Sequence, residues 1–312
     1  YKIEKMSKAL VIIKSMGIGD LVILIANIHA ISKAINRPVV VMAQKNTHAY
    51  EILKHDPHIE EVLDLDKKGI LNIVKKIKPK NFDQSYIYSD SLRLYLISKF
   101  SNIKNNFQYK LFSKKRKNFY KTAKEFTEKV LNLKIESQPK IFLDKSEADN
   151  AAKKFNITKK TKNIICGISA SGPTKRWDIK NYIKLFEIIN RKYPCKFFLA
   201  GGAKDQILID EILNSSIGEY CISFSKMTIQ ETIPVIGACD FCISNDTGFA
   251  HISSALNLKC LMLFMDSPPL AYGSYSKNIS VIVPKDETVE SCGHNTRGKD
   301  KISFDEVLNK TL

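Results

Sequence analysis

Three short segments of the chain combine residue types that bind phosphate or move protons. The first is Met16-Gly17-Ile18-Gly19-Asp20, the second spans residues 169–177 and the third spans residues 245–251. Each follows an apolar run typical of a buried strand and comes before a stretch with helical periodicity. Because ligands of open α/β sheets bind beyond the carboxyl ends of the strands, all three segments are candidate binding sites.

The first segment carries two glycines and a carboxylate. Gly17 and Gly19 permit a tight turn and a close approach of the backbone to a ligand. The segment lacks the third glycine of the dinucleotide fingerprint, and the chain has no Walker A loop. Asp20 fits either a helix N-cap or a carboxylate base. A helix N-terminus stabilises the anion and so weakens the base, which leaves both interpretations open.

The second segment offers hydroxyls, glycine and a Lys-Arg pair between a predicted strand and a predicted helix. Ser169, Ser171 and Lys175, with backbone N–H groups, are suited to hold a phosphate or diphosphate. Arg176 and Trp177 could instead be structural, with the indole packed under the helix. We expect Lys175 to bind phosphate.

The third segment is dense in polar groups. Asp246 and Thr247 could each act as a helix N-cap, or Thr247 and Gly248 could hold phosphate while the His251 imidazole donates to it. Glu231 also has two interpretations. It could accept hydrogen bonds from ribose hydroxyls, or it could close a capping box with Thr228 three residues earlier.

The elements that position these segments alternate between strand and helix. Two successive arrays of this kind predict an α/β fold of two Rossmann-like doubly wound domains, 1–155 and 156–312, facing each other across a cleft. Strands are expected at 9–13, 38–42, 62–65, 82–88 and 141–143, and then at 163–168, 195–200, 241–244, 261–264 and 280–283. Helices are expected at 21–35, 50–55, up to 78, 92–100, 119–133, 146–155, 177–193, 205–214, 228–237, 251–256 and 303–312.

The composition is that of a globular protein, and its unusual feature is charge. The chain has 49 Lys and Arg against 32 Asp and Glu, a formal net charge of +17. Residues 96–145 alone hold 13 basic and 4 acidic residues. Such a protein should meet nucleic acid, an anionic membrane surface or a phosphorylated substrate, unless the excess is compositional drift.

Other global features narrow the class of protein. Seven cysteines without a secretory pattern favour reduced thiols in a cytosol, and the lone Cys239-x-x-Cys242 has no partner motif for zinc, so no metal site is expected. The sequence has no uninterrupted apolar run of about 18 residues, and we therefore expect no transmembrane helix.

The motifs together resemble the bacterial ADP-heptose:lipopolysaccharide heptosyltransferase family, glycosyltransferase family 9. Residues 14–20 resemble its N-terminal Gly-Asp motif, and residues 169–177 its Ser-Gly-x-x-Lys-x-Trp segment. Gly201-Gly202 matches its glycine pair, and Glu231 and Asp240 keep the family interval of nine residues. Residues 245–251 fit Asn-Asp-Thr-Gly-x-x-His. The chain departs from the family pattern at Phe264-Met265 and at residues 266–269.

The resemblance implies a GT-B fold and a metal-independent inverting glycosyltransferase without a cofactor. Asp20 would be the general base, and the acceptor would meet Gly19 and Arg93. Lys175 with Thr247 and Gly248 would hold the donor diphosphate. The resemblance further implies donor-binding roles for Ser169, Ser171, Glu231 at the ribose, Asp246 as the residue that orients the 247–248 turn, and His251.

These observations give the functional hypothesis. We expect transfer of a sugar from a nucleotide sugar, ADP-heptose, to a phosphorylated glycolipid of the lipopolysaccharide core or a related envelope glycan. The protein would be a cytoplasmic monomer, peripheral at the inner membrane, with its basic segment, including Lys114, Lys115, Arg116 and Lys117, on the glycolipid or the anionic surface. The alternatives are a GT-B sugar-nucleotide epimerase and a nucleic-acid-binding protein, for which no motif is present.

Overall fold

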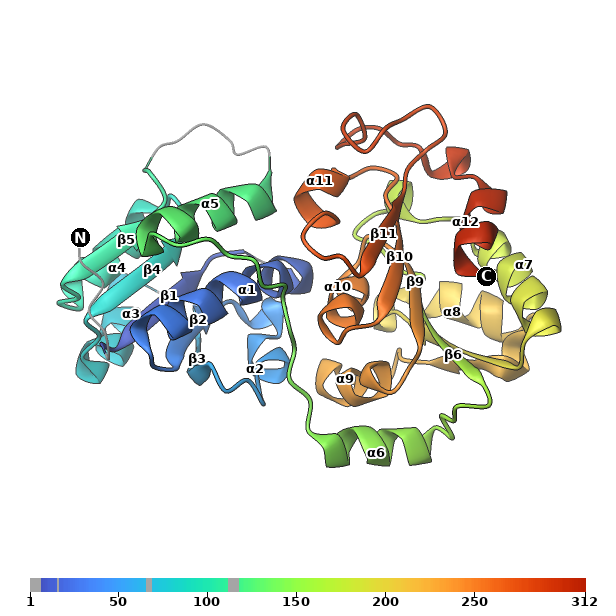
Figure 1. Cartoon of the computed structure of the whole chain (residues 1–312), viewed down its shortest axis with the longest axis horizontal. Coiled ribbons are helices and arrows are strands. Elements are labelled where there is room, and N and C mark those ends of the chain that lie inside the picture. The colour runs from blue at the N-terminus through green and yellow to red at the C-terminus, as the bar shows by residue number, and fades with distance from the viewer. Residues whose placement is uncertain (1–6, 16, 66–68, 112–117) are drawn as a thin grey trace. The chain divides into compact units, whose positions relative to one another are not determined.

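The computed structural model describes residues 7–15, 17–65, 69–111 and 118–312. The chain divides into two compact units, Tyr1–Phe142 and Leu143–Leu312 (Figure 1). The predicted division after residue 155 therefore lies too late in the chain. Helix α6 (Lys145–Lys154) packs against α9 (Ile229–Gly237) and so belongs to the second unit.

Unit 1 is built on a parallel sheet with the strand order β3-β2-β1-β4-β5. The central strand β1 is buried along its whole length because helices cover both faces. The strands are β1 (Ala9–Ile13), β2 (Val39–Ala43), β3 (Ile59–Asp64), β4 (Gln84–Tyr88) and β5 (Asn105–Gln108). The helices are α1 (Ile18–Ile35), α2 (Ala49–Ile52), α3 (Ile70–Ile77), α4 (Leu92–Phe100) and α5 (Phe119–Leu131).

Helices α3 and α4 pack on each other and on one face of this sheet, while α1 and α5 pack together (Figure 1). Leu10 and Ile12 of β1 contribute to the core under α3 and α4. Alternate residues of a strand point to opposite faces, so a strand of five apolar residues serves both layers at once. This explains why the apolar run in the sequence is continuous.

Helix α1 is the helix of the described residues that is long and apolar enough to span a membrane by length and composition. It has 18 residues and a mean hydropathy of 1.6. Polar residues within the helix interrupt the apolar run, so its sequence contains no continuous apolar stretch of about 18 residues. In the structure 72% of the helix is buried within the protein, as expected of a core helix.

Unit 2 is also a parallel α/β unit, with the strand order β11-β10-β9-β6-β7-β8. Its strands are β6 (Lys162–Gly167), β7 (Cys195–Ala200), β8 (Cys221–Ser223), β9 (Phe241–Asn245), β10 (Lys259–Leu263) and β11 (Ile279–Ile282). Besides α6 and α9 its helices are α7 (Ile179–Lys192), α8 (Gln206–Leu213), α10 (Gly248–Ala255), α11 (Pro269–Tyr272) and α12 (Phe304–Thr311).

Most predicted elements of both units are present. The short helix α11 was not predicted, and four further differences concern one strand, one helix cap and two edge strands. Residues 141–143 form no strand, and the N-cap of α6 is Asp144, not Ser146, because its carboxylate accepts from the backbone of Ser146 and Glu147. The short strands β5 and β8 were not predicted. Both lie at sheet edges, and neither has the apolar run that marks a central strand.

Aromatic stacking holds the core of unit 2 together. Phe186 of α7 stacks on Phe197 of β7 with ring centroids 4.3 Å apart, and both rings are fully buried. Trp177 lies in the same core and stacks on Phe304 of α12. The structural interpretation of Trp177 is therefore confirmed.

We expect Phe186→Ala to lower the free energy of unfolding of unit 2 by about 3–5 kcal/mol, because it leaves a cavity under α7. Urea denaturation followed by Trp177 fluorescence measures this, since Trp177 is the only tryptophan and reports on unit 2 alone. Ile207→Ala, at a side chain 83% exposed on α8, is the control and should change little. Equal stability of the two variants would contradict the packing argument.

Candidate functional site

The second and third predicted segments come together at the carboxyl ends of neighbouring strands. Residues 169–175 follow β6 and residues 246–251 follow β9, and these strands pair directly. A side chain at Gly167 would place its Cβ 1.8 Å from the Ser244 Oγ, so only glycine allows this approach. The Ser244 hydroxyl also lies 3.1 Å from the Thr247 Oγ1. The close approach of the two strands thus sets the geometry of the site.

Asn245 joins the two segments through all of its amide groups. Its Oδ1 accepts from the Trp177 backbone N–H and from the Tyr182 hydroxyl, both at 3.1 Å. Its Nδ2 donates to the carbonyl oxygens of Ile168 at 3.0 Å and Ser169 at 3.2 Å. The side chain is fully buried, where an unpaired amide would be costly. Asn245 therefore fixes both ends of the 168–177 loop, a role that no pattern in the sequence indicates.

Asp246 is held by hydrogen bonds from two sides. The Ser267 hydroxyl donates to its Oδ2 at 2.6 Å, and the His251 Nε2 lies 3.5 Å from its Oδ1. Burial alone would raise the pKa of Asp246, but these partners and the charge of Lys175 outweigh it and lower the pKa. The carboxylate is therefore charged and fixed in place at neutral pH.

His251 is not placed to donate to a ligand. Its ring is buried on the first turns of α10, with Nε2 toward Asp246 and Nδ1 2.7 Å from the Tyr275 hydroxyl. The Tyr275 ring stacks on it at 5.6 Å between centroids. The predicted phosphate donor is thus a positioning residue for Asp246, and Tyr275, which the sequence analysis missed, holds its far side.

The charge of Lys175 is felt by two carboxylates. Its charge acts on Asp246 and also on Asp266, which follows β10. Asp266 accepts from the Thr174 hydroxyl at 2.7 Å and from the Arg297 backbone N–H at 3.0 Å. Burial would raise the pKa of Asp266, but these hydrogen bonds and Lys175 lower it. The 266–269 loop, which departs from the family pattern, therefore makes hydrogen bonds with Thr174, next to Lys175, and with Asp246.

The N-terminus of α10 is open toward the same edge. Thr247 is the N-cap, but its side chain makes no capping hydrogen bond, and Gly248 is the first helical residue. Backbone N–H groups and the helix dipole at this end favour an anion. Ser169 is half-buried and Ser171 exposed on the loop that Asn245 fixes, so their hydroxyls belong to the same edge.

Glu231 forms the capping box of α9. Its Oε2 accepts from the Thr228 backbone N–H at 2.7 Å and from the Thr228 hydroxyl at 2.9 Å. The hydrogen bond from the Thr228 backbone N–H is the main cause that lowers the pKa of Glu231, and the bond from the Thr228 hydroxyl lowers it further. The structural interpretation is confirmed, and since both contacts use Oε2, a ligand hydroxyl would have to bind Oε1. Helix α9 follows the edge strand β8, whereas Lys175 follows β6, two strands away in the same sheet.

In unit 1 the predicted residues share one edge of the sheet. Gly19 and Asp20 are in the first turn of α1 after β1, and Arg93 is in the first turn of α4 after β4, the strand next to β1. The N-cap of α1 is Gly17, so Asp20 is not the N-cap. Gly17 has an extended φ of −111°, and a Cβ there would be 3.7 Å from the Asp20 carboxylate. The fold therefore does not require a glycine here, which favours close approach of a ligand.

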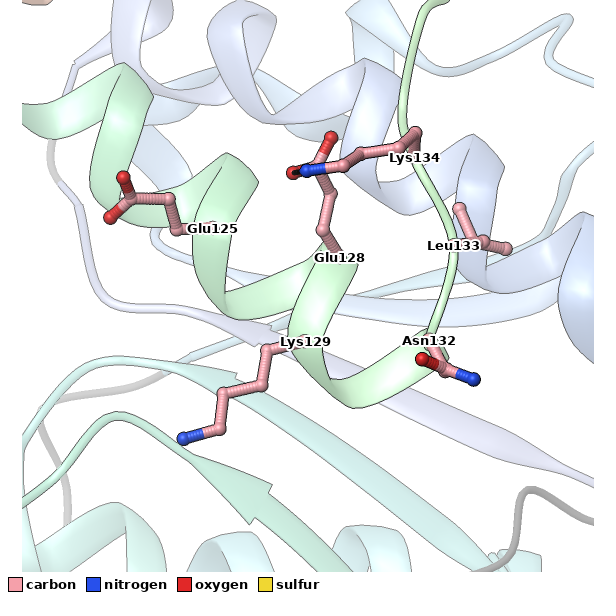
Figure 2. Close-up of a pocket in the computed structure, with 6 residues that line it drawn as sticks. All are labelled: Glu125, Glu128, Lys129, Asn132, Leu133 and Lys134. Atoms are coloured by element: carbon pink, nitrogen blue, oxygen red, sulfur yellow. Dashed lines mark hydrogen bonds and ion pairs between the residues drawn. The ribbon is translucent and has the colours of Figure 1, made fainter.

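A pocket also lies elsewhere in unit 1, at the C-terminal end of α5 (Figure 2). It has a volume of about 490 Å³ and is lined by Glu125, Glu128, Lys129, Asn132, Leu133 and Lys134. Figure 2 shows Lys134 reaching toward Glu128, 3.4 Å away, while Lys129 points away from it. The Ile135 backbone N–H chiefly lowers the pKa of Glu128. This pocket contains no predicted site residue and is not the candidate site.

The described residues hold no group of three or more His, Cys, Asp or Glu side chains placed to bind a metal ion. Cys239 and Cys242 are both buried, and burial raises the pKa of the Cys239 thiol. A thiol that stays protonated is a poor nucleophile and metal ligand. These cysteines therefore pack as part of the core.

Comparison with known proteins shows the family of this chain. Residues 71–302 match the sequence model of glycosyltransferase family 9 (heptosyltransferase), and the chain belongs to this family. Lipooligosaccharide heptosyltransferase 2 of Haemophilus influenzae is 32% identical over 109 residues, a match that covers 33% of this chain and 31% of that protein. Lipopolysaccharide heptosyltransferase 1 of Campylobacter coli is 23% identical over 283 residues, or 81% of each chain.

Solved structures show the same fold. The Escherichia coli ADP-heptose lps heptosyltransferase II has a TM-score of 0.76 at 19% identity, over 97% of each chain. A glycosyl transferase family 9 protein of Veillonella parvula has a TM-score of 0.82 at 18% identity, over 99% of this chain and 97% of that one. The predicted GT-B fold with two Rossmann-like units is therefore confirmed.

We expect Asn245→Ala to lower the free energy of unfolding of unit 2 by about 1–3 kcal/mol, because it leaves buried N–H and carbonyl groups unpaired. Chemical denaturation measures this change. Tyr182→Phe, which removes only one of the contacts, should have a smaller effect. An Asn245→Ala variant as stable as wild type would contradict the role of Asn245.

The lowered pKa of Asp246 predicts a pH dependence. The unfolded carboxyl titrates at about pH 3.9, so the folded carboxylate stabilises unit 2 above that value and loses this contribution as the pH falls through its lower folded pKa. Asp246→Asn should destabilise unit 2 at neutral pH, and the difference from wild type should shrink below about pH 4. Denaturation at a series of pH values tests this. A difference that is constant with pH would show that the charge contributes nothing.

Proposed function

We propose that this protein is a heptosyltransferase that moves a sugar from a nucleotide-diphosphate donor, ADP-heptose, to a lipopolysaccharide core or related envelope glycan. Membership of family 9 and the names of the relatives support the reaction class. The observation that carries the proposal is a cluster at the carboxyl edge of unit 2, made of Lys175, Ser169, Ser171 and the N-terminus of α10. This cluster presents a cation, hydroxyls and an open helix N-terminus on one edge of the sheet.

The donor would bind to unit 2 through its diphosphate. Lys175 and the backbone N–H groups at the start of α10 offset the charge, Ser169 and Ser171 donate hydroxyls, and Glu231 accepts from a ribose hydroxyl through Oε1. The charge of Lys175 also acts on Asp246 and Asp266. A single ammonium carries less charge than a diphosphate, so the N-terminus of α10 is an essential part of the donor site in this proposal.

The reaction is an inverting displacement. The acceptor hydroxyl oxygen forms a bond to the anomeric carbon, and the bond from that carbon to the phosphate oxygen breaks. Asp20 takes the hydroxyl proton, and ADP leaves with the bonding electron pair. Lys175 and the α10 N-terminus stabilise the negative charge that develops on the phosphate, which is the work a metal ion does in other transferases. This makes metal independence part of the proposal.

The acceptor side belongs to unit 1. Gly19 and Arg93 lie at the same sheet edge as Asp20 and would contact a phosphorylated glycolipid. In this proposal the protein is a monomer and works at the cytoplasmic face of the inner membrane. The basic residues Lys114, Lys115, Arg116 and Lys117, expected to contact the glycolipid, lie outside the described residues. Nucleic acid has no part in this proposal.

Two substitutions separate the donor site from the base. Lys175→Ala should weaken ADP binding about 10-fold or more and reduce turnover about 10²–10³-fold, because it removes a charge aimed at the leaving group. Asp20→Asn should reduce turnover about 10²–10⁴-fold and leave the Kd for ADP unchanged. ADP release with ADP-heptose and a core acceptor, and calorimetry with ADP, give the two readouts.

Two results would contradict the proposal. Undiminished turnover in Asp20→Asn would exclude Asp20 as the base. Equal ADP affinity in wild type and Lys175→Ala would exclude Lys175 from the donor site. Lys180→Ala, at an exposed lysine of α7, is the matched control and should behave as wild type.

A further inference from the structure

The sides of α3 and α4 that face away from the sheet of unit 1 carry large apolar side chains among their lysines. Both helices already bury an apolar side against the sheet, through Ile73, Val74 and Ile77 of α3 and Leu94 and Ile97 of α4. A surface helix normally presents polar residues on its opposite side. Here Leu71 is 69% exposed, Leu92 46% and Phe100 52%. Packing within unit 1 does not account for these three side chains.

The exposed apolar residues follow helical spacing. Leu92, Leu96 and Phe100 are four residues apart and so lie along one side of α4, with Leu96 half-buried. On α3, Leu71 is one turn before Lys75, and Lys78 follows three residues later. Because α3 and α4 pack side by side on the same face of the sheet, their outer sides form one surface (Figure 1).

The charge on this surface has a single sign. Residues 70–80 and 92–104 contain six Lys and one Arg, and neither segment contains Asp or Glu. Lys75, Lys78, Lys99 and Lys104 are exposed. Lys80 is partly buried and pairs with Glu61 at 2.6 Å. The Lys99 ammonium lies 5.6 Å from the centroid of the Tyr95 ring, one turn earlier on α4.

We propose that the outer α3–α4 face, made of Leu71, Lys75, Lys78, Leu92, Lys99 and Phe100, docks on an anionic lipid bilayer. Leucine and phenylalanine side chains enter the boundary between headgroups and acyl chains, and the surrounding lysines meet the headgroup phosphates. The proposal deepens the proposed function, since it names the surface on which unit 1 would meet a lipid-linked acceptor.

Two other partners fit this face less well. A second copy of the chain in a two-fold dimer would set its lysines against the same lysines, which costs free energy in a dry interface. A nucleic acid would use the lysines but would leave Leu71 and Leu92 without a partner, because single-strand sites stack bases on aromatic rings. A bilayer uses both the charge and the aliphatic side chains.

Sedimentation of the full chain with vesicles tests the proposal. Wild type should bind vesicles of phosphatidylethanolamine and phosphatidylglycerol, and should bind phosphatidylcholine vesicles much more weakly. Lys75→Gln, Lys78→Gln and Lys99→Gln together should weaken binding to the anionic vesicles about 100-fold. Leu71→Ser, Leu92→Ser and Phe100→Ser together should remove the part of the binding that persists at high salt.

The matched controls lie in unit 2. Lys153→Gln, Lys159→Gln and Lys160→Gln make the same change of charge at exposed lysines, and Ile207→Ser changes an exposed aliphatic side chain. These variants should bind vesicles as wild type. Equal losses in control and test variants would overturn the proposal, because binding would then follow net charge alone. A wild-type dimer that the Leu71, Leu92 and Phe100 variant dissociates would also overturn it.

The outcome is distinguishable from that of the proposed function. The test variants should keep the wild-type Kd for ADP and the wild-type rate on a water-soluble acceptor fragment, and should lose rate only on acceptor held in vesicles. Vesicle binding that depends on this face, in a protein without transferase activity, would refute the proposed function and not the surface. Transferase activity with vesicle binding that the substitutions leave unchanged would refute the surface.

Discussion

The candidate donor site depends on one buried side-chain amide. Asn245 ends β9 and satisfies the backbone at both ends of the loop that follows β6. A loop of serines, glycine and proline has little apolar surface of its own with which to fix its conformation. The amide supplies that constraint from a neighbouring strand, and the glycine at position 167 lets the two strands approach closely enough for it to reach.

This constraint also determines the electrostatics. With the loop fixed, Lys175 stands near two carboxylates whose own hydrogen bonds keep them ionised. The negative charge of these carboxylates offsets part of the positive potential that Lys175 presents to a ligand. The helix N-terminus at Gly248 is then a second source of positive potential. Asp246, which contacts Ser267 and His251, holds the turn that leads into this helix.

Much of this could be predicted from the sequence, and the remainder has identifiable physical reasons. The strands that carry the segments are continuous apolar runs, so the two α/β units and the edge on which Lys175 and Thr247 lie followed from the alternation of strands and helices. The GT-B fold followed from the resemblance to the family. The edge strands β5 and β8 were missed because half-exposed strands have mixed composition. The roles of Asn245, Tyr275 and Asp266 arise only from contacts between residues distant in the chain. His251 shows the converse, since a histidine beside a polar motif suggested a ligand contact, whereas its partners are both internal.

The 266–269 loop has a consequence for how this site can vary. Thr174 bonds to Asp266, and Asp246 bonds to Ser267, so the loop after β10 shares its hydrogen bonds with the loops after β6 and β9. If one of these three loops is exchanged alone, a hydroxyl or a carboxylate in another loop loses its hydrogen-bond partner. Positions 174 and 266, and positions 246 and 267, should therefore change as pairs over evolutionary time. A chimaera that grafts a relative's loop into this chain must carry both members of each pair.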